Sequence, residues 1–283
     1  MSASVIIVSY RTGAVLADCL SALAAASGVD EIILVDNGNA PAEVRALDAF
    51  AAAHAKARLL RGQGNVGFSR ACNLAAAQAQ SEVLLFANPD VILRPDAAER
   101  LEAALAAAPP PAIVGGDLRD SAGLPERGAR RERLTLWRAF VSFTGLSKLE
   151  RLGPAFRDFN RERDPLPADA VAVGAVSGAL MAMRRADFEA LGGFDAGYFL
   201  HVEDVDICRR AEDAGWRVLF APGPHGVHVR SSSGATPSEI ARHKARSFAR
   251  YFRKFARSPL ERALSWLAGP VLYVLLPLTS GRR

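Results

Sequence analysis

The sequence predicts an α/β fold, with a mostly parallel central sheet, helices on both faces and a C-terminal helical extension. Strand and helix patterns alternate through the first 115 residues, and half of the 283 residues are apolar, which suits one large core. Charge gathers near the C-terminus, where seven Lys and Arg lie between Arg242 and Arg257 without an acid. The other 28 of the 35 basic residues face 30 acidic ones, so the main body is slightly acidic.

The elements of the first half follow from residue spacing. Apolar, β-branched runs that end in turn residues predict strands, and apolar residues at helical spacing predict helices. The strands are expected at residues 5–9, 31–36, 57–60 and 83–87, and the helices over 15–23, from Pro41, over 69–79 and from Pro95. In such a sheet the ligand site lies off the C-terminal ends of the strands.

Residues 118–170 are rich in Arg, Gly and Pro and predict a long irregular segment with a short helix near 134–146. Arginines cluster there, at positions 127, 130, 131 and 133. Three interpretations stay open, namely a flexible lid, an acceptor-binding surface and a solvated basic loop. Regular structure is expected to resume with a strand over 175–185, interrupted by Gly178.

The C-terminal part predicts a basic helix over 238–256 with interleaved aromatic residues, and then an apolar stretch over 264–278. Gly269-Pro270 and Pro277 are expected to break this stretch, which is shorter than the roughly twenty residues of a membrane span. A basic helix beside a short apolar segment favours an anionic membrane surface. The alternative is a helix packed on the sheet domain.

Cysteine usage and the N-terminus bear on the compartment. Cys19, Cys72 and Cys208 form no CxxC pair and lie in predicted helices, which indicates buried free thiols in a reducing compartment. The chain enters a strand at once, without a basic or long apolar leader, so no signal peptide is expected.

The segment 62–67 reads Gly-Gln-Gly-Asn-Val-Gly and matches the G-x-G-x-x-G pattern of dinucleotide-binding proteins. It follows the third predicted strand instead of the first, and the acid about twenty positions on, Glu82, precedes the next strand instead of ending it. A nicotinamide-dependent oxidoreductase is therefore a minor alternative. The glycines still allow close approach to a ligand, and the helix start after them favours anions.

Acidic and imidazole side chains gather at the ends of predicted elements. They are Asp36, Asp90, Glu203, Asp204, Asp206, His225 and His228. One acid at a helix start is ordinarily a cap or a dipole partner, but three acids within residues 203–206 exceed what a cap needs. The stretch Asn88-Pro89-Asp90 has two open interpretations, a turn and a metal site, because all three residue types form turns.

Seven segments, in order, resemble family 2 glycosyltransferases of the GT-A fold, and among these the bacterial rhamnosyltransferase-like branch. They are VIIVSY, ILVDNGN, GNVGFSRACN, LLFANPDV, VSGALMAMRR, GGFDAGYFLHVEDVDICRRAEDAGWRV and the late His228 followed by serines, within residues 5–233. The resemblance implies a GT-A domain over 1–235, with a nucleotide-sugar-binding half (1–115) and an acceptor and catalytic half (171–235). Residues 236–283 would form the C-terminal extension.

The resemblance also implies roles for particular residues. Asp90 and His228 would hold a Mg²⁺ or Mn²⁺ ion, with Asn88 where many relatives carry Asp. Asp204 would be the general base, Glu203 would orient it or hold the acceptor, and Asp206 is assigned to structure. The implied donor-binding residues are Ser9, Tyr10, Asp36, Asn65, Gly67, Arg70, Asn73 and Asn88.

The function implied is an inverting, metal-dependent glycosyltransferase that builds a surface polysaccharide. dTDP-rhamnose is the first expected donor and a UDP-sugar the next, with a hydroxyl of a glycan or lipid-linked glycan as acceptor and no nucleic-acid partner. The enzyme would be cytoplasmic and peripheral at the inner face of the cytoplasmic membrane. A catalytically inactive, nucleotide-binding module of the same fold is the alternative.

Overall fold

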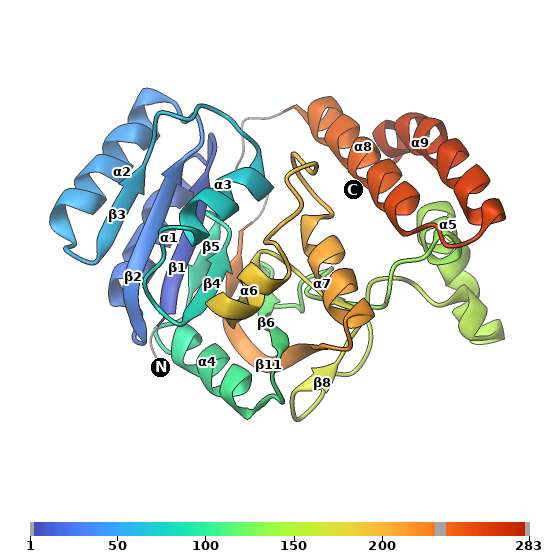
Figure 1. Cartoon of the computed structure of the whole chain (residues 1–283), viewed down its shortest axis with the longest axis horizontal. Helices are drawn as coiled ribbons and strands as arrows, with labels where there is room; N and C mark the ends of the chain where they lie inside the picture. The colour runs from blue at the N-terminus through green and yellow to red at the C-terminus, as the bar shows by residue number, and fades with distance from the viewer. Residues whose placement is uncertain (1–2, 230–235, 281–283) are drawn as a thin grey trace.

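A mixed sheet forms the centre of the molecule (Figure 1), and the computed structural model describes residues 3–229 and 236–280. Its strands are Ala3–Ser9 (β1), Val29–Asp36 (β2), Ala57–Leu60 (β3), Val83–Ala87 (β4), Val91–Leu93 (β5), Ala112–Arg119 (β6), Val171–Ala172 (β8), Leu180–Arg184 (β10) and Arg217–His228 (β11). They lie in the order β3-β2-β1-β4-β10-β6-β11-β5, with β8 paired to β11. The first four are parallel and β11 is parallel to β6, whereas β5, β8 and β10 run antiparallel to their neighbours.

Helices cover both faces of this sheet, as predicted. Alternate residues of β1 point to opposite faces, so Val5 and Ile7 join one buried cluster while Ile6 and Val8 join the other. The first cluster contains α1 (Val15–Ala25), α2 (Pro41–Ala53) and α4 (Ala97–Ala107), and the second contains α3 (Phe68–Ala76), α6 (Arg185–Ala190) and α7 (Glu203–Asp213). The predicted α/β fold is therefore confirmed.

The individual predictions differ most in the second half of the sheet. β3 and β4 lie where they were expected, but β5 and β6 were not predicted. β11 extends to His228, because it pairs with β6 and then with β5 along its second half. The strand expected at 175–185 is interrupted at Gly178, as predicted, and forms β9 (Ala175–Val176) and β10.

The segment 118–170 is folded and carries short elements. They are β7 (Arg130–Arg131), α5 (Leu136–Thr144), η1 (Leu146–Leu152) and η2 (Pro154–Phe156), and β7 pairs with β9. Its arginines meet carboxylates: Arg127 lies 3.6 Å from Glu162, and Arg131 lies 2.9 Å from Asp204. The arginine cluster is thus ion-paired, which differs from the solvated basic loop among the predicted alternatives.

The C-terminal helices form a pair on one side of the molecule, next to α5 (Figure 1). α8 (Pro237–Phe255) is the predicted basic helix, and it buries Phe248, Tyr251 and Phe252 in the main core. The prediction of a broken segment after it is wrong, because α9 (Pro259–Ser280) runs through Gly269-Pro270. A Cβ at Gly269 would lie 3.2 Å from Ala249 of α8, so glycine permits close packing that supports the helix there.

None of the helices in the described ranges is long and apolar enough to cross a membrane. The three cysteines are buried and unpaired, as expected. The division of the chain at residue 235 stays a prediction, and the serines at 231–233 lie outside the described residues.

Candidate functional site

The ends of β1 and β2 bring the predicted base-binding residues together. Ser9 and Asp36 are register partners in the parallel pair. Asp36 Oδ1 accepts hydrogen bonds from the backbone of Gly38 and Asn39 and from the Asn39 amide, at 2.9–3.1 Å. Buried Ser9 donates from Oγ to Asn39 Oδ1 at 3.0 Å. Asn39, which the sequence interpretation did not select, therefore fixes the edge at which Ser9, Asp36 and the half-buried Tyr10 lie.

The glycine-containing loop before α3 is fixed to this edge. Asn65 Oδ1 accepts from the Asn37 amide at 3.0 Å and from the Gly67 backbone at 3.2 Å. Gly67 has φ +84°, and a Cβ on it would lie 2.7 Å from the Phe199 carbonyl oxygen. Only glycine suits this position without strain, so the loop and the 192–200 segment meet across it.

Two predicted donor-binding residues on α3 have different surroundings. Arg70 is exposed, and no carboxylate of residues 3–229 or 236–280 pairs with it. Asn73 instead holds the 192–200 segment, because its amide donates to the Phe194 carbonyl at 2.8 Å and accepts from the Phe194 N–H at 2.9 Å. Both donor roles stay predictions.

Asp90 and His228 meet through the antiparallel pairing of β5 with β11. Val91 and His228 are register partners, and the Val229 N–H donates to the Asp90 carbonyl at 3.0 Å. His228 Nε2 lies 3.0 Å from Asp90 Oδ1, and both residues are about nine-tenths buried. Strand pairing therefore joins side chains that are 138 positions apart.

The other ring nitrogen of His228 is also held. Nδ1 lies 2.7 Å from Oε1 of buried Glu126, a residue that the sequence interpretation did not select. Burial alone would lower the pKa of His228, but the hydrogen bonds and charges of Asp90 and Glu126 raise this pKa to about 9. The environment therefore favours positive charge at this point.

Asp90 and His228 offer a carboxylate oxygen and an imidazole nitrogen that meet at 3.0 Å, and both donor types can hold a divalent ion. Within the described ranges no group of three or more His, Cys, Asp or Glu is arranged to hold a metal. An ion held by Asp90 and His228 would thus take its remaining ligands from a substrate diphosphate and water.

Asp204 begins α7 and is fixed by three contacts. Oδ2 accepts from Arg131 at 2.9 Å and from the Gly178 N–H at 3.0 Å, and Oδ1 accepts from the Val205 N–H at 2.8 Å. Burial opposes ionisation, but the Arg131 charge and these hydrogen bonds outweigh it and lower the pKa of Asp204. Asp204 is therefore a carboxylate at neutral pH.

Glu203 has the opposite environment. It is buried, and its Oε2 has no hydrogen-bond partner among the described residues. Burial, and then the charge of Asp204, raise the pKa of Glu203. The pKa of Asp204 is thus lowered and the pKa of its neighbour Glu203 is raised. Such a difference lets one acid accept a proton as a carboxylate while the other stays protonated.

Two other acidic or imidazole candidates have structural partners. Asp206 is fully buried and meets Arg210 and Lys254, each at 2.6 Å, and the Tyr198 hydroxyl at 3.0 Å. His225 accepts the Asp117 N–H at Nδ1, and burial lowers its pKa to about 4. Asp206 therefore joins α7 to α8 through these ion pairs, which agrees with its assignment to structure.

Residues 177–179 contact both the turn that precedes Asp90 and the buried carboxylate of Asp204. The Asn88 N–H donates to the Ala179 carbonyl at 3.0 Å, so the Asn-Pro-Asp turn is bonded to this loop. Gly178 of the same loop holds Asp204, and a Cβ there would lie 3.3 Å from Asp204 Cβ. The loop interrupted at Gly178 thus contacts both Asp204 and Asn88, the first residue of the Asn-Pro-Asp turn.

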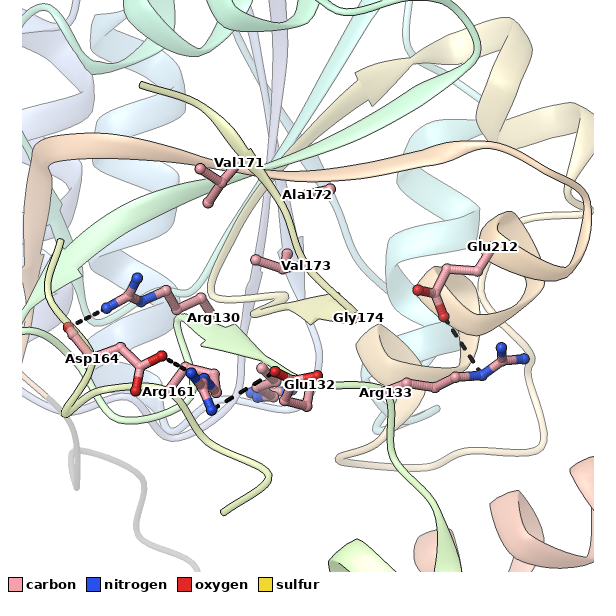
Figure 2. Close-up of a pocket in the computed structure, with 11 residues that line it drawn as sticks. Arg130, Glu132, Arg133, Arg161, Asp164, Val171, Ala172, Val173, Gly174 and Glu212 are labelled. Carbon is pink, nitrogen blue, oxygen red and sulfur yellow. Dashed lines mark hydrogen bonds and ion pairs between the residues drawn. The ribbon is translucent and has the colours of Figure 1, made fainter. Parts of the chain in front are cut away.

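A cavity of about 400 Å³ lies elsewhere, beside β7, β8 and the end of α7 (Figure 2). Its arginines are paired: Arg161 with Asp164 and Glu132, and Arg133 with Glu212 at 3.8 Å. β8 pairs with β11 at Leu219 and Phe220, whereas His228 ends that strand. Asp90 and His228 are not among the residues that line the cavity, whereas Arg131, the partner of Asp204, is.

Together, the sheet order, the acidic turn after β4 and the paired acids at the start of α7 define a GT-A glycosyltransferase. The chain belongs to the glycosyltransferase-like family 2, whose model matches residues 2–257. The oxidoreductase alternative is therefore wrong, because the glycine-containing loop is part of a glycosyltransferase domain.

Known rhamnosyltransferases are similar in sequence. The N-acetylglucosaminyl-diphospho-decaprenol L-rhamnosyltransferase of Mycobacterium tuberculosis is 28% identical over 263 residues, which covers 84% of this chain and 80% of that protein. The rhamnosyltransferase WbbL of Escherichia coli K12 is 36% identical over 92 residues, about a third of each chain (32% and 30%).

Solved structures share the fold. The mannosyltransferase PcManGT from Pyrobaculum calidifontis, in complex with GDP-Man and Mn²⁺, has a TM-score of 0.61 at 18% identity and covers 98% of this chain and 73% of its own. GalNAc-T7 with UDP, GalNAc and Mn²⁺ also has a TM-score of 0.61, at 16% identity. The match covers 93% of this chain, which spans about half (51%) of GalNAc-T7.

Proposed function

We propose that this glycosyltransferase moves a sugar, rhamnose from dTDP-rhamnose first and a UDP-sugar next, onto a hydroxyl of a lipid-linked glycan with inversion at the anomeric carbon. The observation that carries the proposal is that the 177–179 loop is hydrogen-bonded both to Asp204 and to Asn88, two residues before the Asp90 that meets His228. The names of the rhamnosyltransferase relatives support the donor and acceptor classes.

In the proposed mechanism Asp204 takes the proton of the acceptor hydroxyl as that oxygen attacks the anomeric carbon. Arg131 keeps Asp204 ionised, and the Gly178 N–H fixes its orientation. Burial raises the pKa of Glu203 and keeps this side chain protonated, so no second negative charge lies beside Asp204. A Mg²⁺ or Mn²⁺ ion held by Asp90 and His228 would stabilise the charge of the leaving nucleoside diphosphate as a Lewis acid.

The donor would occupy the edge formed by β1, β2 and the loop before α3. Asp36 would accept the imide N–H of a thymine or uracil ring, and Ser9 and Tyr10 would flank the base and ribose. Asn65, Gly67 and Asn88 would lie along the diphosphate. Exposed Arg70 would offset its charge, whereas Asn73 would act indirectly, by holding the 192–200 segment.

Thermal stability tests this proposal and separates it from an inactive nucleotide-binding module. dTDP, UDP, GDP and NAD⁺ are each added with Mn²⁺ or with chelator. At a hundred times Kd, a ligand stabilises the folded state by about 2.7 kcal/mol. We expect Mn²⁺-dependent stabilisation by dTDP or UDP, with sugar transfer by the same preparation. Binding without transfer would favour the inactive module, and no shift with any nucleotide would contradict the donor site.

We further propose that α9 lies on the inner, anionic face of the cytoplasmic membrane, where a lipid-linked acceptor is found. Leu260, Leu264, Leu267 and Val271 follow a spacing of four, three and four residues and are 44–69% exposed. This stripe faces away from α8, because Gly269, which lies against Ala249 of α8, is on the opposite side of the helix. Arg253, 5.0 Å above the Trp266 ring, supplies charge complementary to anionic lipid.

Sedimentation with vesicles tests the membrane face. The double variant Leu264→Glu/Leu267→Glu is expected to bind phosphatidylglycerol vesicles at least about tenfold more weakly, because each exposed leucine contributes on the order of 1 kcal/mol on burial. Leu166→Glu, an exposed leucine outside α9, is the control and should bind like the wild type. Vesicle binding by the double variant equal to that of the wild type would contradict this orientation. If the double variant instead loses self-association, the stripe is a contact with a second copy of the chain.

A further inference from the structure

We propose that Glu126 is a positioning residue that fixes the His228 imidazole so that Nε2 faces the divalent cation beside Asp90. This inference rests on the proposed metal-binding role of Asp90 and His228. It assigns a function to a residue in the 118–170 segment, which the sequence interpretation treated as irregular.

The contact is short and enclosed. Glu126 Oε1 lies 2.7 Å from His228 Nδ1, and the side chains of Glu126 and His228 are 4% and 10% exposed. An imidazole rotates about two single bonds, and a partner at Nδ1 removes most of that freedom. With Nδ1 occupied, Nε2 is the nitrogen directed at Asp90, 3.0 Å away.

Hydrogen bonds to the backbone fix the position of Glu126. Asp120 closes a turn after β6, with Oδ1 accepting the N–H groups of Ala122 and Leu124 at 2.9 Å. The Glu126 N–H then donates to the Leu118 carbonyl at 2.9 Å, so residue 126 is bonded to β6. β6 pairs with β11 through Leu118 and Gly226, two residues before His228. Glu126 follows β6 and is thus bonded back to it, the strand that neighbours β11 and its His228.

The buried contact between Glu126 and His228 suits a role that packing alone does not explain. A buried carboxylate is costly unless it is paired, and Glu126 is paired with His228. A histidine that ligates a metal commonly gives its second ring nitrogen to a carboxylate, which sets the tautomer and the ring orientation. Glu126 satisfies that requirement from a segment remote in sequence.

The test measures Mn²⁺ affinity by electron paramagnetic resonance of the free ion, in the full chain with dTDP and separately with UDP. Glu126→Gln keeps the size of the side chain but removes its charge, and we expect Mn²⁺ binding about 10- to 100-fold weaker. Glu126→Asp, which keeps the charge but shortens the reach, should also weaken Mn²⁺. Glu150→Gln, an exposed acid of the same segment, is the control and should match the wild type.

The outcomes separate the inference from the function on which it rests. If His228→Ala loses Mn²⁺ affinity while Glu126→Gln, folded by circular dichroism, stays within twofold of the wild type, Glu126 has no positioning role. If His228→Ala keeps wild-type affinity, the metal role of His228 fails, and the inference fails with it. Weaker Mn²⁺ binding with unchanged metal-free melting temperature supports positioning over a purely structural role.

Discussion

Replacing Asp204 by asparagine is expected to reduce turnover by about 10²-fold or more while leaving donor binding nearly unchanged. Asparagine has almost the same size and can still accept from Gly178 and Arg131, but it cannot take the acceptor proton. Initial rates with saturating donor, beside nucleotide affinity from thermal shifts, provide the measurement. Glu189→Gln, a 60%-exposed side chain on α6, is the matched control. Wild-type turnover in Asp204→Asn would remove this residue from the mechanism.

The contact between Arg131 and Asp204 makes the pH dependence of activity a second test of the role of Asp204. Arg131 is among the groups that lower the pKa of Asp204 against the effect of burial, so Arg131→Met should raise that pKa. The base works only when ionised, and the acid limb of kcat/KM should therefore move to higher pH. Activity would be lost first at low pH and recovered as pH rises. An acid limb at the wild-type position would mean that Asp204 is not the titrating base.

Replacing Asp90 by asparagine is expected to lower turnover by about 10²-fold or more, because Lewis-acid stabilisation of the leaving group provides several kcal/mol. The change also removes the negative partner of His228, so Mn²⁺-dependent stabilisation by the nucleotide should disappear. Thermal shifts with Mn²⁺ and with chelator measure this directly.

Asp96→Asn supplies the comparison for Asp90→Asn, because Asp96 is a half-exposed acid that follows β5 and lies 3.6 Å from Arg94 and 3.9 Å from Arg100. It should leave turnover and the metal response unchanged. A full metal response in Asp90→Asn would show that the ion is held elsewhere, and the proposed site would then be wrong.

The local sequence determined the N-terminal half of the fold. Short β-branched runs that end in Asn, Gly or Pro give β1 to β4 nearly at their bounds, because such strands are buried on both faces and read as continuous apolar runs. Pro41 begins α2 for a comparable local reason, since its fixed φ suits the first turn of a helix. These features depend on neighbours in the chain.

Tertiary structure decided what depends on distant partners. β11 continues to His228 only because β6 and β5 pair with it, and α9 runs through Gly269-Pro270 because α8 packs against it. Asp90 and Asp204 were recognisable as acids in a family-like order. Glu126, the partner of His228, and Arg131, the partner of Asp204, were not recognisable in these roles, because a lone acid and one arginine in a basic cluster carry no local pattern.

The sequence by itself thus determined the family, the α/β class and the candidate acids, since these lie in contiguous segments with their own spacing. Only the tertiary structure decided which charges face each other, Glu126 on His228 and Arg131 on Asp204, and that Oε2 of Glu203 has no hydrogen-bond partner among the described residues. The physical reason is that pKa and ligand orientation depend on burial and on charges a few ångströms away, and folding brings those from positions far apart in the chain.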